Sequence, residues 1–430
     1  MVGTIGPSSI LVKDGETMSM KYILLIGDGM ADNPVPALDG RTPLQAAHKP
    51  CIDALAARGV VGSVKNVPDG MPAGSETAIM SIFGCDPKQY FTGRSPMEAA
   101  ASGITLQQGD AAYRCNIICL EDADLPMDEK KILSHSAGSI EGEDALEVVK
   151  ILTADEEFAA LLQKAQMVIH PFPAFRQIAV QSSADISQLK LTPPHDHLDE
   201  VCGPYLPKGG EIGPLMEAMI RRAHAVLNTH PLNDRRRAEG KMPANAIWFW
   251  AQGTAVQLPQ FREVYGHGGG VISAVPLCHG IAVLTGLDMI EIPGATGEID
   301  TNWDGKMEKA CELICGEDDF VAIHIEAPDE CTHNGDLPGK LQSIEWIDSR
   351  ILQPLLQRID QEDFDYRLLI LSDHKTLTAT RGHDGDPVPY LLYQKGVDTG
   401  FGGVYDEETG LKGPMMERGA DLMKLLFEQL

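Results

Sequence analysis

The chain has little positive charge and lacks several common sequence features. It carries 35 Lys and Arg against 62 Asp and Glu, a formal net charge of −27 at pH 7. Nucleic acids and anionic membranes are bound through basic surfaces, so this balance argues against both as partners. No apolar run approaches the roughly 20 residues that a membrane helix requires. The absence of a G-x-x-x-x-G-K-[ST] sequence argues against a P-loop kinase.

Disulfide and zinc patterns are also missing. The nine cysteines include no C-x-x-C pair, and Cys115/Cys119 and Cys311/Cys315 are best interpreted as small buried thiols in a reducing cytosol. Residues 1–19 contain charged residues and no apolar core long enough for a signal peptide, so we interpret them as an N-terminal extension. We therefore expect a cytoplasmic protein.

The order of sequence patterns indicates two domains, as the length of 430 residues also favours. Residues 20–110 and 259–430 alternate apolar strand-like runs with helical spacing, for example a strand over Tyr22–Ile26 and a helix over 42–58. Over residues 111–258 the pattern changes: His and Arg are frequent, Pro and Gly recur, and no acid or histidine cluster follows a strand-like run. We predict an α/β protein whose doubly wound sheet core, residues 20–110 and 259–430, is split by a smaller inserted α+β domain at 111–258.

The most informative residues are acids and histidines that follow apolar runs. They are Asp28, Asp329 with His333, Asp373 with His374, and His383. Because the carboxyl ends of parallel strands meet at one edge of a sheet, these side chains can converge on one site. Three Asp and three His suit two divalent cations, and their mixture of carboxylate and imidazole favours manganese, zinc or cobalt, with magnesium possible.

The two pairs are weak signals individually. Asp329 and His333 are four residues apart, which places both on one face of a helical turn. Asp373 and His374 are neighbours and would point to opposite faces of a strand, so we place them at a strand end where the alternation has lapsed. The prediction rests on all four clusters occurring together.

Ser75 has two interpretations. It follows Gly74 and precedes helical spacing from Glu76 to Phe83, so its side chain could cap the helix. Alternatively, it could accept a phosphoryl group, because amides and the helix dipole at a helix N-terminus favour anions. No histidine is close in sequence to act as base, but a divalent cation also lowers the pKa of a bound hydroxyl. Sequence spacing leaves nucleophile and cap equally open.

Two further segments of the inserted region carry candidate residues. His195 and His197 lie in a proline-broken stretch, and we interpret them as part of a loop or as close to the substrate. The run Asn233–Arg237 is best explained as a solvated charged turn. A protein this acidic nevertheless needs guanidinium groups to hold an anionic substrate, because their planar fork matches phosphate and carboxylate.

With these residues in place, the chain resembles the archaeal-type cofactor-independent phosphoglycerate mutases, members of the alkaline phosphatase superfamily. The resemblance runs from about Lys21 to the C-terminus. It is carried, in order, by the motifs Ile26–Asp32, Ala73–Thr77, Thr92–Ala99, Tyr113–Asn116, Thr192–Asp196, Pro293–Gly297, Glu326–Glu330 and Asp386–Pro389. Each motif is modest alone, but their occurrence together and in this order is specific.

The resemblance implies a function and a set of site residues. Ser75 would take the phosphoryl group of 3-phosphoglycerate and return it to the other hydroxyl, giving 2-phosphoglycerate. One metal would be bound by Asp28, Ser75, Asp373 and His374, and the other by Asp329, His333 and His383. Manganese is the first expectation, with zinc, cobalt or magnesium as alternatives. The inserted region would close over this small phosphorylated acid and bind it through Arg114, Arg176 and Arg236. The oligomeric state is left open.

The chain departs from the family pattern at two positions. Within Val271–Gly280, His279 stands where the family has a lysine near the phosphoryl group, and Lys375 replaces the usual proline after His374. A histidine titrates near neutrality, so His279 bears on substrate identity. Alternatives are phosphoryl transfer to another acceptor, as proposed for homoserine kinase-like relatives, and a phosphatase or phosphodiesterase. A metal-binding regulatory protein without catalysis is disfavoured by the retention of Ser75.

Overall fold

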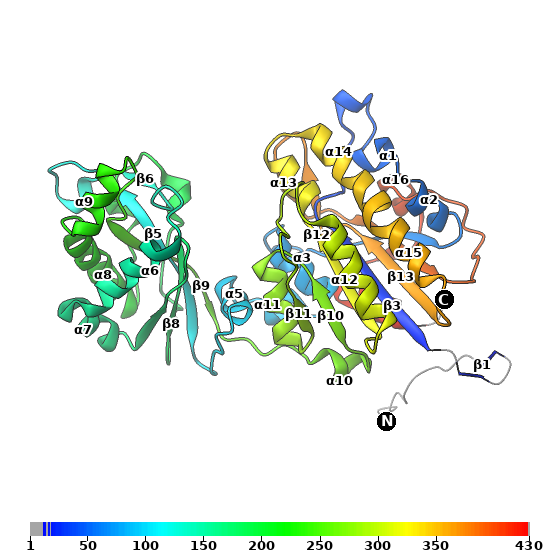
Figure 1. The fold of residues 1–430 in the computed structure, drawn as a ribbon, viewed down its shortest axis with the longest axis horizontal. Coiled ribbons are helices and arrows are strands. Elements are labelled where there is room, and N and C mark those ends of the chain that lie inside the picture. The colour runs from blue at the N-terminus through cyan, green and yellow to red at the C-terminus, as the bar shows by residue number, and fades with distance from the viewer. Residues whose placement is uncertain (1–11, 14–15, 18, 429–430) are drawn as a thin grey trace. The chain divides into compact units, whose positions relative to one another are not determined.

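The computed structural model describes residues 12–13, 16–17 and 19–428. Most of the expected N-terminal extension, residues 1–19, therefore lies outside the described residues. The chain divides into two compact units, Met1–Phe91 with Gln257–Leu430 and Thr92–Val256 (Figure 1). In the described part of the chain, no helix has the length and apolarity to cross a membrane.

The core of the first unit is an eight-stranded mixed sheet of order β11-β10-β12-β3-β13-β16-β4-β17. Its strands are β3 (Met20–Gly27), β4 (Val60–Val64), β10 (Gly269–Ile272), β11 (Asp288–Ile290), β12 (Phe320–Ile325), β13 (Asp365–Leu371), β16 (Val388–Gln394) and β17 (Met415–Met416). The run from β11 to β13 is parallel, and β16 is antiparallel to both of its neighbours. The expected α/β class is confirmed, with a sheet that is mixed rather than wholly parallel.

Helices surround this sheet. They are α1 (Pro43–Ala46), α2 (Pro50–Ala56), α3 (Ser75–Ile82), α4 (Pro87–Tyr90), α10 (Phe261–Tyr265), α11 (Pro276–Thr285), α12 (Trp303–Cys315), α13 (Ala327–His333), α14 (Leu337–Trp346), α15 (Gln353–Ile359), α16 (Glu407–Lys412) and α17 (Leu422–Phe427). Helices α12 and α15 lie side by side along one face (Figure 1). Strands whose two faces are both covered by helices have nearly continuous apolar sequences, as β3 and β13 do.

The single helix expected over 42–58 is wrong. The structure has α1 and α2, separated by extended backbone at Ala47. Pro50 is the cause, because a proline restricts the residue before it and cannot donate a backbone hydrogen bond. It is instead the first residue of α2.

Register brings three chain segments to one edge of the sheet. Gly27 at the end of β3 pairs with Ile325 at the end of β12, and Ile26 pairs with Leu371 at the end of β13. The chain therefore leaves three adjacent parallel strands at the same level. A short hairpin, β14 (Lys375–Leu377) and β15 (Gly382–Asp384), follows β13 directly.

The second unit is built on a five-stranded antiparallel sheet. Its strands are β5 (Ala111–Leu120), β6 (Ile132–Ser134), β7 (Met167–His170), β8 (Arg176–Gln181) and β9 (Ala246–Thr254). Its helices are α5 (Ser95–Ala101), α6 (Gly142–Ala154), α7 (Glu156–Lys164), α8 (Ile212–Leu227) and α9 (Pro231–Ala238). Its apolar core includes Trp248 and Phe249, both fully buried.

Two expectations for this region differ from the structure. The unit begins at Thr92 rather than 111, because α5 packs on β5 and Ser95 donates a hydrogen bond to the carbonyl of Ala251. Its end at Val256 is close to the expected 258. The segment 233–237 is helical rather than a turn: Pro231 opens α9, and the side chain of His230 caps it.

Candidate metal centre

Three buried side chains form a first group at the sheet edge. Asp28, Asp373 and His374 each offer an atom within 4.8 Å of the others. Asp28 follows β3, and its backbone amide donates to the carbonyl of Ile325 (2.9 Å). The amide of Gly29 donates to Asp373 Oδ1 (3.1 Å), which fixes the second carboxylate relative to the first.

The polar atoms of this group suit a cation. Asp28 Oδ1 and Asp373 Oδ2 are buried and accept no hydrogen bond from any described residue. Burial, followed by the charges of Asp373 and Asp329, raises the pKa of Asp28 well above its ordinary value. Buried carboxylate oxygens with free lone pairs and mutual repulsion are costly unless a positive charge lies between them. A divalent cation supplies that charge.

His374 and Ser75 complete the first group. His374 Nε2 lies 3.2 Å from Asp373 Oδ2 and 3.6 Å from Asp28 Oδ1. Burial lowers the pKa of His374, which favours the neutral imidazole that binds metals. The hydroxyl oxygen of Ser75 is 3.2 Å from His374 Nε2 and 3.4 Å from Asp28 Oδ2. The N-cap alternative for Ser75 does not hold, because Gly74 is the cap residue and Ser75 is the first residue of α3.

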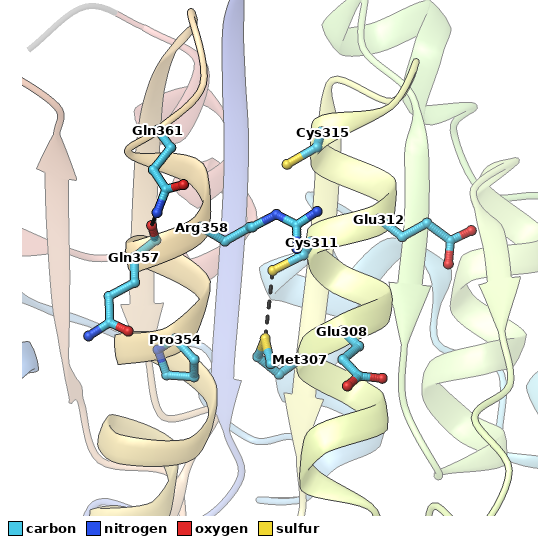
Figure 2. Close-up of a pocket in the computed structure, with 9 residues that line it drawn as sticks. All are labelled: Met307, Glu308, Cys311, Glu312, Cys315, Pro354, Gln357, Arg358 and Gln361. Atoms are coloured by element: carbon cyan, nitrogen blue, oxygen red, sulfur yellow. Dashed lines mark hydrogen bonds between the residues drawn. The ribbon is translucent and has the colours of Figure 1, made fainter.

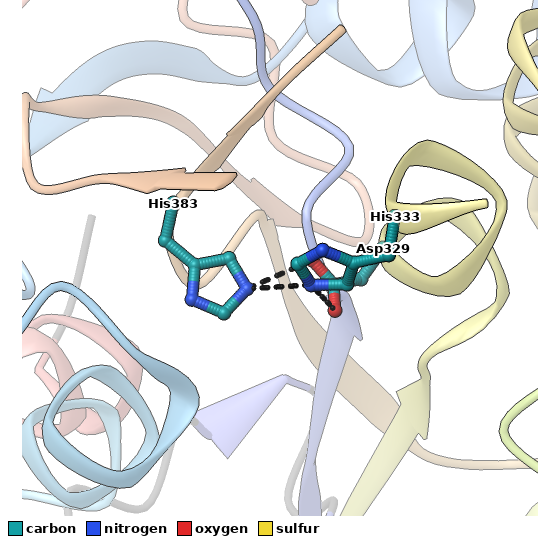
Figure 3. A group of neighbouring side chains, drawn as sticks. All are labelled: Asp329, His333 and His383. Carbon is teal, nitrogen blue, oxygen red and sulfur yellow. Dashed lines mark hydrogen bonds and ion pairs between the residues drawn. The ribbon is translucent and has the colours of Figure 1, made fainter. Parts of the chain in front are cut away.

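A second group comprises Asp329, His333 and His383 (Figure 3). Asp329 and His333 share one face of α13, as their spacing predicts, and His383 comes from β15. His333 Nε2 is 3.1 Å from Asp329 Oδ2, and His383 Nε2 is 3.3 Å from Asp329 Oδ1. The two Nε2 atoms are 2.9 Å apart, so both rings direct the same nitrogen at one carboxylate.

The hydrogen bonds of the second group also suit a cation. His333 Nδ1 lies 2.8 Å from the carbonyl oxygen of Arg381, which can only accept. A neutral His333 therefore carries its proton on Nδ1 and presents a lone pair from Nε2. Burial acts to raise the pKa of Asp329, but hydrogen bonds from His333 and His383 outweigh it and lower the pKa. The same contact raises the pKa of His333 to about 9; without a cation, a proton is drawn into this position.

His324 contacts the first group and was missed by the sequence analysis. It lies in β12, is 1% exposed, and its Nε2 is 3.0 Å from Asp28 Oδ2. Its Nδ1 is 3.0 Å from the hydroxyl oxygen of Ser273. Burial lowers the pKa of His324 to about 3, so the ring is neutral. The available signal was a histidine inside an otherwise apolar strand, where burial requires polar partners.

Two more buried polar side chains lie on the helices of the first unit. His279, in α11, has an Nε2 atom without a hydrogen-bond partner among the described residues, and burial lowers its pKa. Lys306, in α12, has its Nζ 3.4 Å from the carbonyl oxygen of His324, and burial lowers its pKa to about 8. The charge of Lys306 contributes to the lowered pKa values of His279 and His324. The first unit therefore contains a buried lysine, Lys306, although position 279, where the family has a lysine, is a histidine.

The second unit gathers arginines around one carboxylate. Arg114 donates through Nε to Glu98 Oε2 (2.7 Å) and through a terminal nitrogen to Oε1, and it lies 4.5 Å from the ring centre of Trp250. Arg94 Nε donates to Glu98 Oε1 (3.2 Å). Burial, followed by repulsion from Arg114, lowers the pKa of Arg176 to about 10. The buried Nε of Arg176 has no hydrogen-bond partner among the described residues.

The remaining expected residues of this unit have different surroundings. The ring of His195 lies 4.9 Å from that of Trp250 and 5.9 Å from that of His135, centre to centre. Arg236 is buried, and it donates to Asp144 Oδ2 (2.7 Å) and to the carbonyl oxygens of Met242 (3.0 Å) and Ala137 (3.1 Å). Its guanidinium is therefore occupied by intradomain contacts.

A separate pocket of about 450 Å³ lies between α12 and α15 (Figure 2). Cys311 and Cys315 line it, and Cys311 Sγ is 3.6 Å from Met307 Sδ. All nine cysteines are free, and all but Cys51 and Cys315 are buried. None of the residues that line this pocket belongs to either Asp/His group.

The fold and the site together define an α/β protein with a serine beside two Asp/His groups suited to divalent cations. Residues 56–233 match the family model described as 2,3-bisphosphoglycerate-independent phosphoglycerate mutase. Proteins of that name from Methanosarcina barkeri, over 411 residues, and Methanothrix thermoacetophila, over 409, are each 41% identical, covering 95% of this chain and all of theirs.

Two solved structures are also similar to this chain. A Pyrococcus horikoshii protein has a TM-score of 0.76 at 29% identity, covering 96% of this chain and 100% of its own. The cofactor-independent phosphoglycerate mutase of Thermoplasma acidophilum has a TM-score of 0.63 at 25% identity, covering 95% and 98%. The chain belongs to the family of 2,3-bisphosphoglycerate-independent phosphoglycerate mutases. The family expected from the sequence is confirmed.

Proposed function

We propose that this protein interconverts 3-phosphoglycerate and 2-phosphoglycerate, a step of glycolysis and gluconeogenesis, through a phosphoryl group carried on Ser75. The observation that carries the proposal is the position of the Ser75 hydroxyl, 3.2 Å from His374 and 3.4 Å from Asp28 at the first turn of α3. A phosphoryl group on this oxygen would lie at a helix N-terminus, where amides and the helix dipole favour its negative charge.

The reaction has two balanced halves. In the first, a bond forms between Ser75 Oγ and phosphorus, the bond from phosphorus to the substrate oxygen breaks, and the proton of Ser75 leaves while the departing glycerate oxygen gains one. Glycerate then reorients. In the second, its other hydroxyl attacks phosphorus, the bond to Ser75 Oγ breaks, and the proton returns to the serine. Water must be excluded between the halves, since otherwise it would take the phosphoryl group.

Two divalent cations are proposed for the two groups. Asp28, Ser75, Asp373 and His374 would hold one, and Asp329, His333 and His383 the other. When bound, the cations would lower the pKa of the Ser75 hydroxyl and offset charge on the phosphoryl oxygens. The donor set of carboxylate and imidazole fits manganese first, with zinc, cobalt or magnesium as alternatives.

For the substrate's anionic groups we propose Arg114 and Arg176, helped by Arg94. These three guanidinium groups face a single carboxylate, Glu98, which leaves excess positive charge in a chain of net charge −27. Guanidinium groups bind carboxylate and phosphate through paired hydrogen bonds. His279 stays in the proposed set on account of its unpartnered buried Nε2.

Arg236 is not included in the proposed substrate set. Its guanidinium is buried and donates to Asp144, Met242 and Ala137 within the second unit. Binding a substrate would require these contacts to be broken, which leaves buried acceptors without partners.

Phosphorus NMR tests the proposal. Mn²⁺-loaded protein is given 3-phosphoglycerate without any bisphosphoglycerate, and a 2-phosphoglycerate resonance should grow in. Ser75→Ala should abolish it, whereas Ser349→Ala, an exposed serine on another helix, should not. Release of inorganic phosphate alone would reject the mutase in favour of a phosphatase. Phosphate transfer only to an added acceptor such as homoserine would favour the kinase-like alternative.

A further inference from the structure

One buried hydroxyl group touches a member of each Asp/His group. Thr376 is the central residue of β14 and is fully buried. Its Oγ1 atom lies 2.5 Å from Asp329 Oδ1, in the second group, and 3.2 Å from His374 Nδ1, in the first. The rings of His374 and His383 also lie 4.1 Å apart, centre to centre, and the threonine adds a hydrogen-bonded link to this ring contact.

The chemistry of the three partners fixes the direction of both hydrogen bonds. An ionised carboxylate only accepts, so the Thr376 hydroxyl donates to Asp329. Its oxygen then accepts from the Nδ1–H of His374. A neutral imidazole has one proton, so His374 Nε2 is left with a lone pair, and this nitrogen is the one facing Ser75 and Asp373. The threonine thereby selects the imidazole tautomer that can bind a cation.

The surrounding backbone holds this hydroxyl in place. The amide of Thr376 donates to the carbonyl of Ala31 (3.1 Å), and Thr376 pairs with His383 across the β14–β15 hairpin. Gly29 packs on the other side with φ of +61°. A Cβ atom there would lie 2.4 Å from Thr376 Oγ1 and 2.8 Å from Asp329 Oδ1. The hairpin and the glycine turn therefore confine the hydroxyl between the two groups.

We propose that Thr376 is a positioning residue that couples the two cation groups. Without its hydroxyl, Asp329 loses a hydrogen bond that orients it, and His374 is free to place its proton on Nε2, where a cation would bind. One substitution therefore weakens both groups, whereas a residue serving one group would weaken only that one. This inference rests on the proposed two-cation function.

The test compares Thr376→Val, which replaces the hydroxyl by a methyl group of similar size, with Thr376→Ser, which keeps the hydroxyl. Mn²⁺ binding to the full chain is titrated by electron paramagnetic resonance, independently of turnover. Loss of an outer hydrogen bond to a metal ligand typically costs about 10–100-fold in metal affinity. We expect about a tenfold loss at both sites for Thr376→Val and near-complete recovery in Thr376→Ser.

Thr285→Val is the matched control, because Thr285 is also buried in the first unit and its hydroxyl donates only to the helix carbonyls of Ile281 and Ala282. It should bind Mn²⁺ like the wild type. If Thr376→Val does not fold, Thr376→Ala, which adds no bulk, takes its place. Unchanged binding by the variant, or weakening of one site alone, would overturn the coupling. If the wild type itself bound no Mn²⁺, the proposed function would fail first and this inference with it.

Discussion

The Nε2 atom of His324 lies 3.0 Å from the Oδ2 atom of Asp28. On its other side, His324 Nδ1 faces the hydroxyl of Ser273, whose oxygen already accepts from the amide of Val275 (3.0 Å). Because an ionised carboxylate only accepts, the imidazole proton is on Nε2 and is donated to Asp28, and Nδ1 accepts the proton of the Ser273 hydroxyl. This chain of hydrogen bonds occupies one oxygen of Asp28 and leaves Oδ1 for a cation.

We predict that His324→Leu lowers kcat/KM for phosphoglycerate about tenfold or more, since support of a metal-ligating carboxylate is worth about 10–100-fold. His324→Gln, which keeps a donor N–H, should retain more activity. Steady-state kinetics at saturating Mn²⁺ measure the effect. His48→Leu, at an exposed position, is the control. Equal activity of His324→Leu and wild type would show that Asp28 does not depend on this contact.

The positions of the acidic and histidine residues could be predicted because parallel strands place their ends together. Asp28, Asp329 and Asp373 each follow an apolar run, and the structure joins those runs as neighbouring strands. The grouping of Asp329 with His333 followed from helical spacing alone. The division of the six residues into two groups came from the family resemblance and not from spacing, because it depends on where the β14–β15 hairpin carries His383.

The supporting residues were beyond sequence reasoning for physical reasons. Thr376 and His324 act through hydrogen bonds set by side-chain packing. Thr376 is close to His374 in sequence and His324 interrupts an apolar run, but no spacing pattern indicates these hydrogen bonds. Arg236 was expected to bind substrate, within a run otherwise explained as a solvated turn, whereas it is buried in α9 by contacts from distant residues such as Asp144. The early start of the second unit at Thr92 likewise depends on the packing of α5 against β5, which no local pattern reveals.

The two cation groups should be separable by substitution. Asp373→Asn removes a charge from the first group and Asp329→Asn from the second, with little change in shape. Each variant should bind one Mn²⁺ tightly where the wild type binds two, and each should lack mutase activity because both ions are needed to offset phosphoryl charge. Titration followed by electron paramagnetic resonance counts the ions. Two tight sites in either variant would contradict the assignment.

Removal of the cations should destabilise the first unit. A ligand that binds only the folded state stabilises it by about 2.7 kcal/mol at a concentration 100 times its Kd. The cation also relieves the repulsion that raises the pKa of Asp28. Calorimetry of the full chain should show an unfolding temperature that is lowered by a chelator and restored by added Mn²⁺. A transition insensitive to both would indicate that no ion is held there.

The arginines of the second unit should control substrate binding more than turnover. Arg114→Lys and Arg176→Lys keep the charge but remove the planar fork, and hydrogen bonds to charged groups contribute about 1.5–3 kcal/mol. We expect kcat/KM to fall about 10–100-fold, mainly through KM. Arg222→Lys, which alters an ion pair with Asp155 in the same unit, is the control. A fall in kcat alone would assign these arginines to a later step.

Glu98 gives the second unit a defined pH dependence. Burial acts to raise the pKa of Glu98, but hydrogen bonds from Arg114 and the charges of Arg114 and Arg94 outweigh it and lower the pKa. A carboxyl group whose pKa is lower in the folded state stabilises the fold above its unfolded pKa, about 4.3 for glutamate. That contribution is lost as the pH falls through the lowered folded value.

We therefore predict that Glu98→Gln destabilises the protein at pH 7, by about 3 kcal/mol, because it leaves buried guanidinium groups without their counter-charge. The difference in unfolding temperature between wild type and variant should persist down to about pH 4.3 and shrink below it, as the wild-type carboxylate takes up its proton. Glu143→Gln, at an exposed position of α6, should show no such difference. If the difference in unfolding temperature between Glu98→Gln and wild type instead widened on acidification, the arginines would not hold Glu98 in its ionised form.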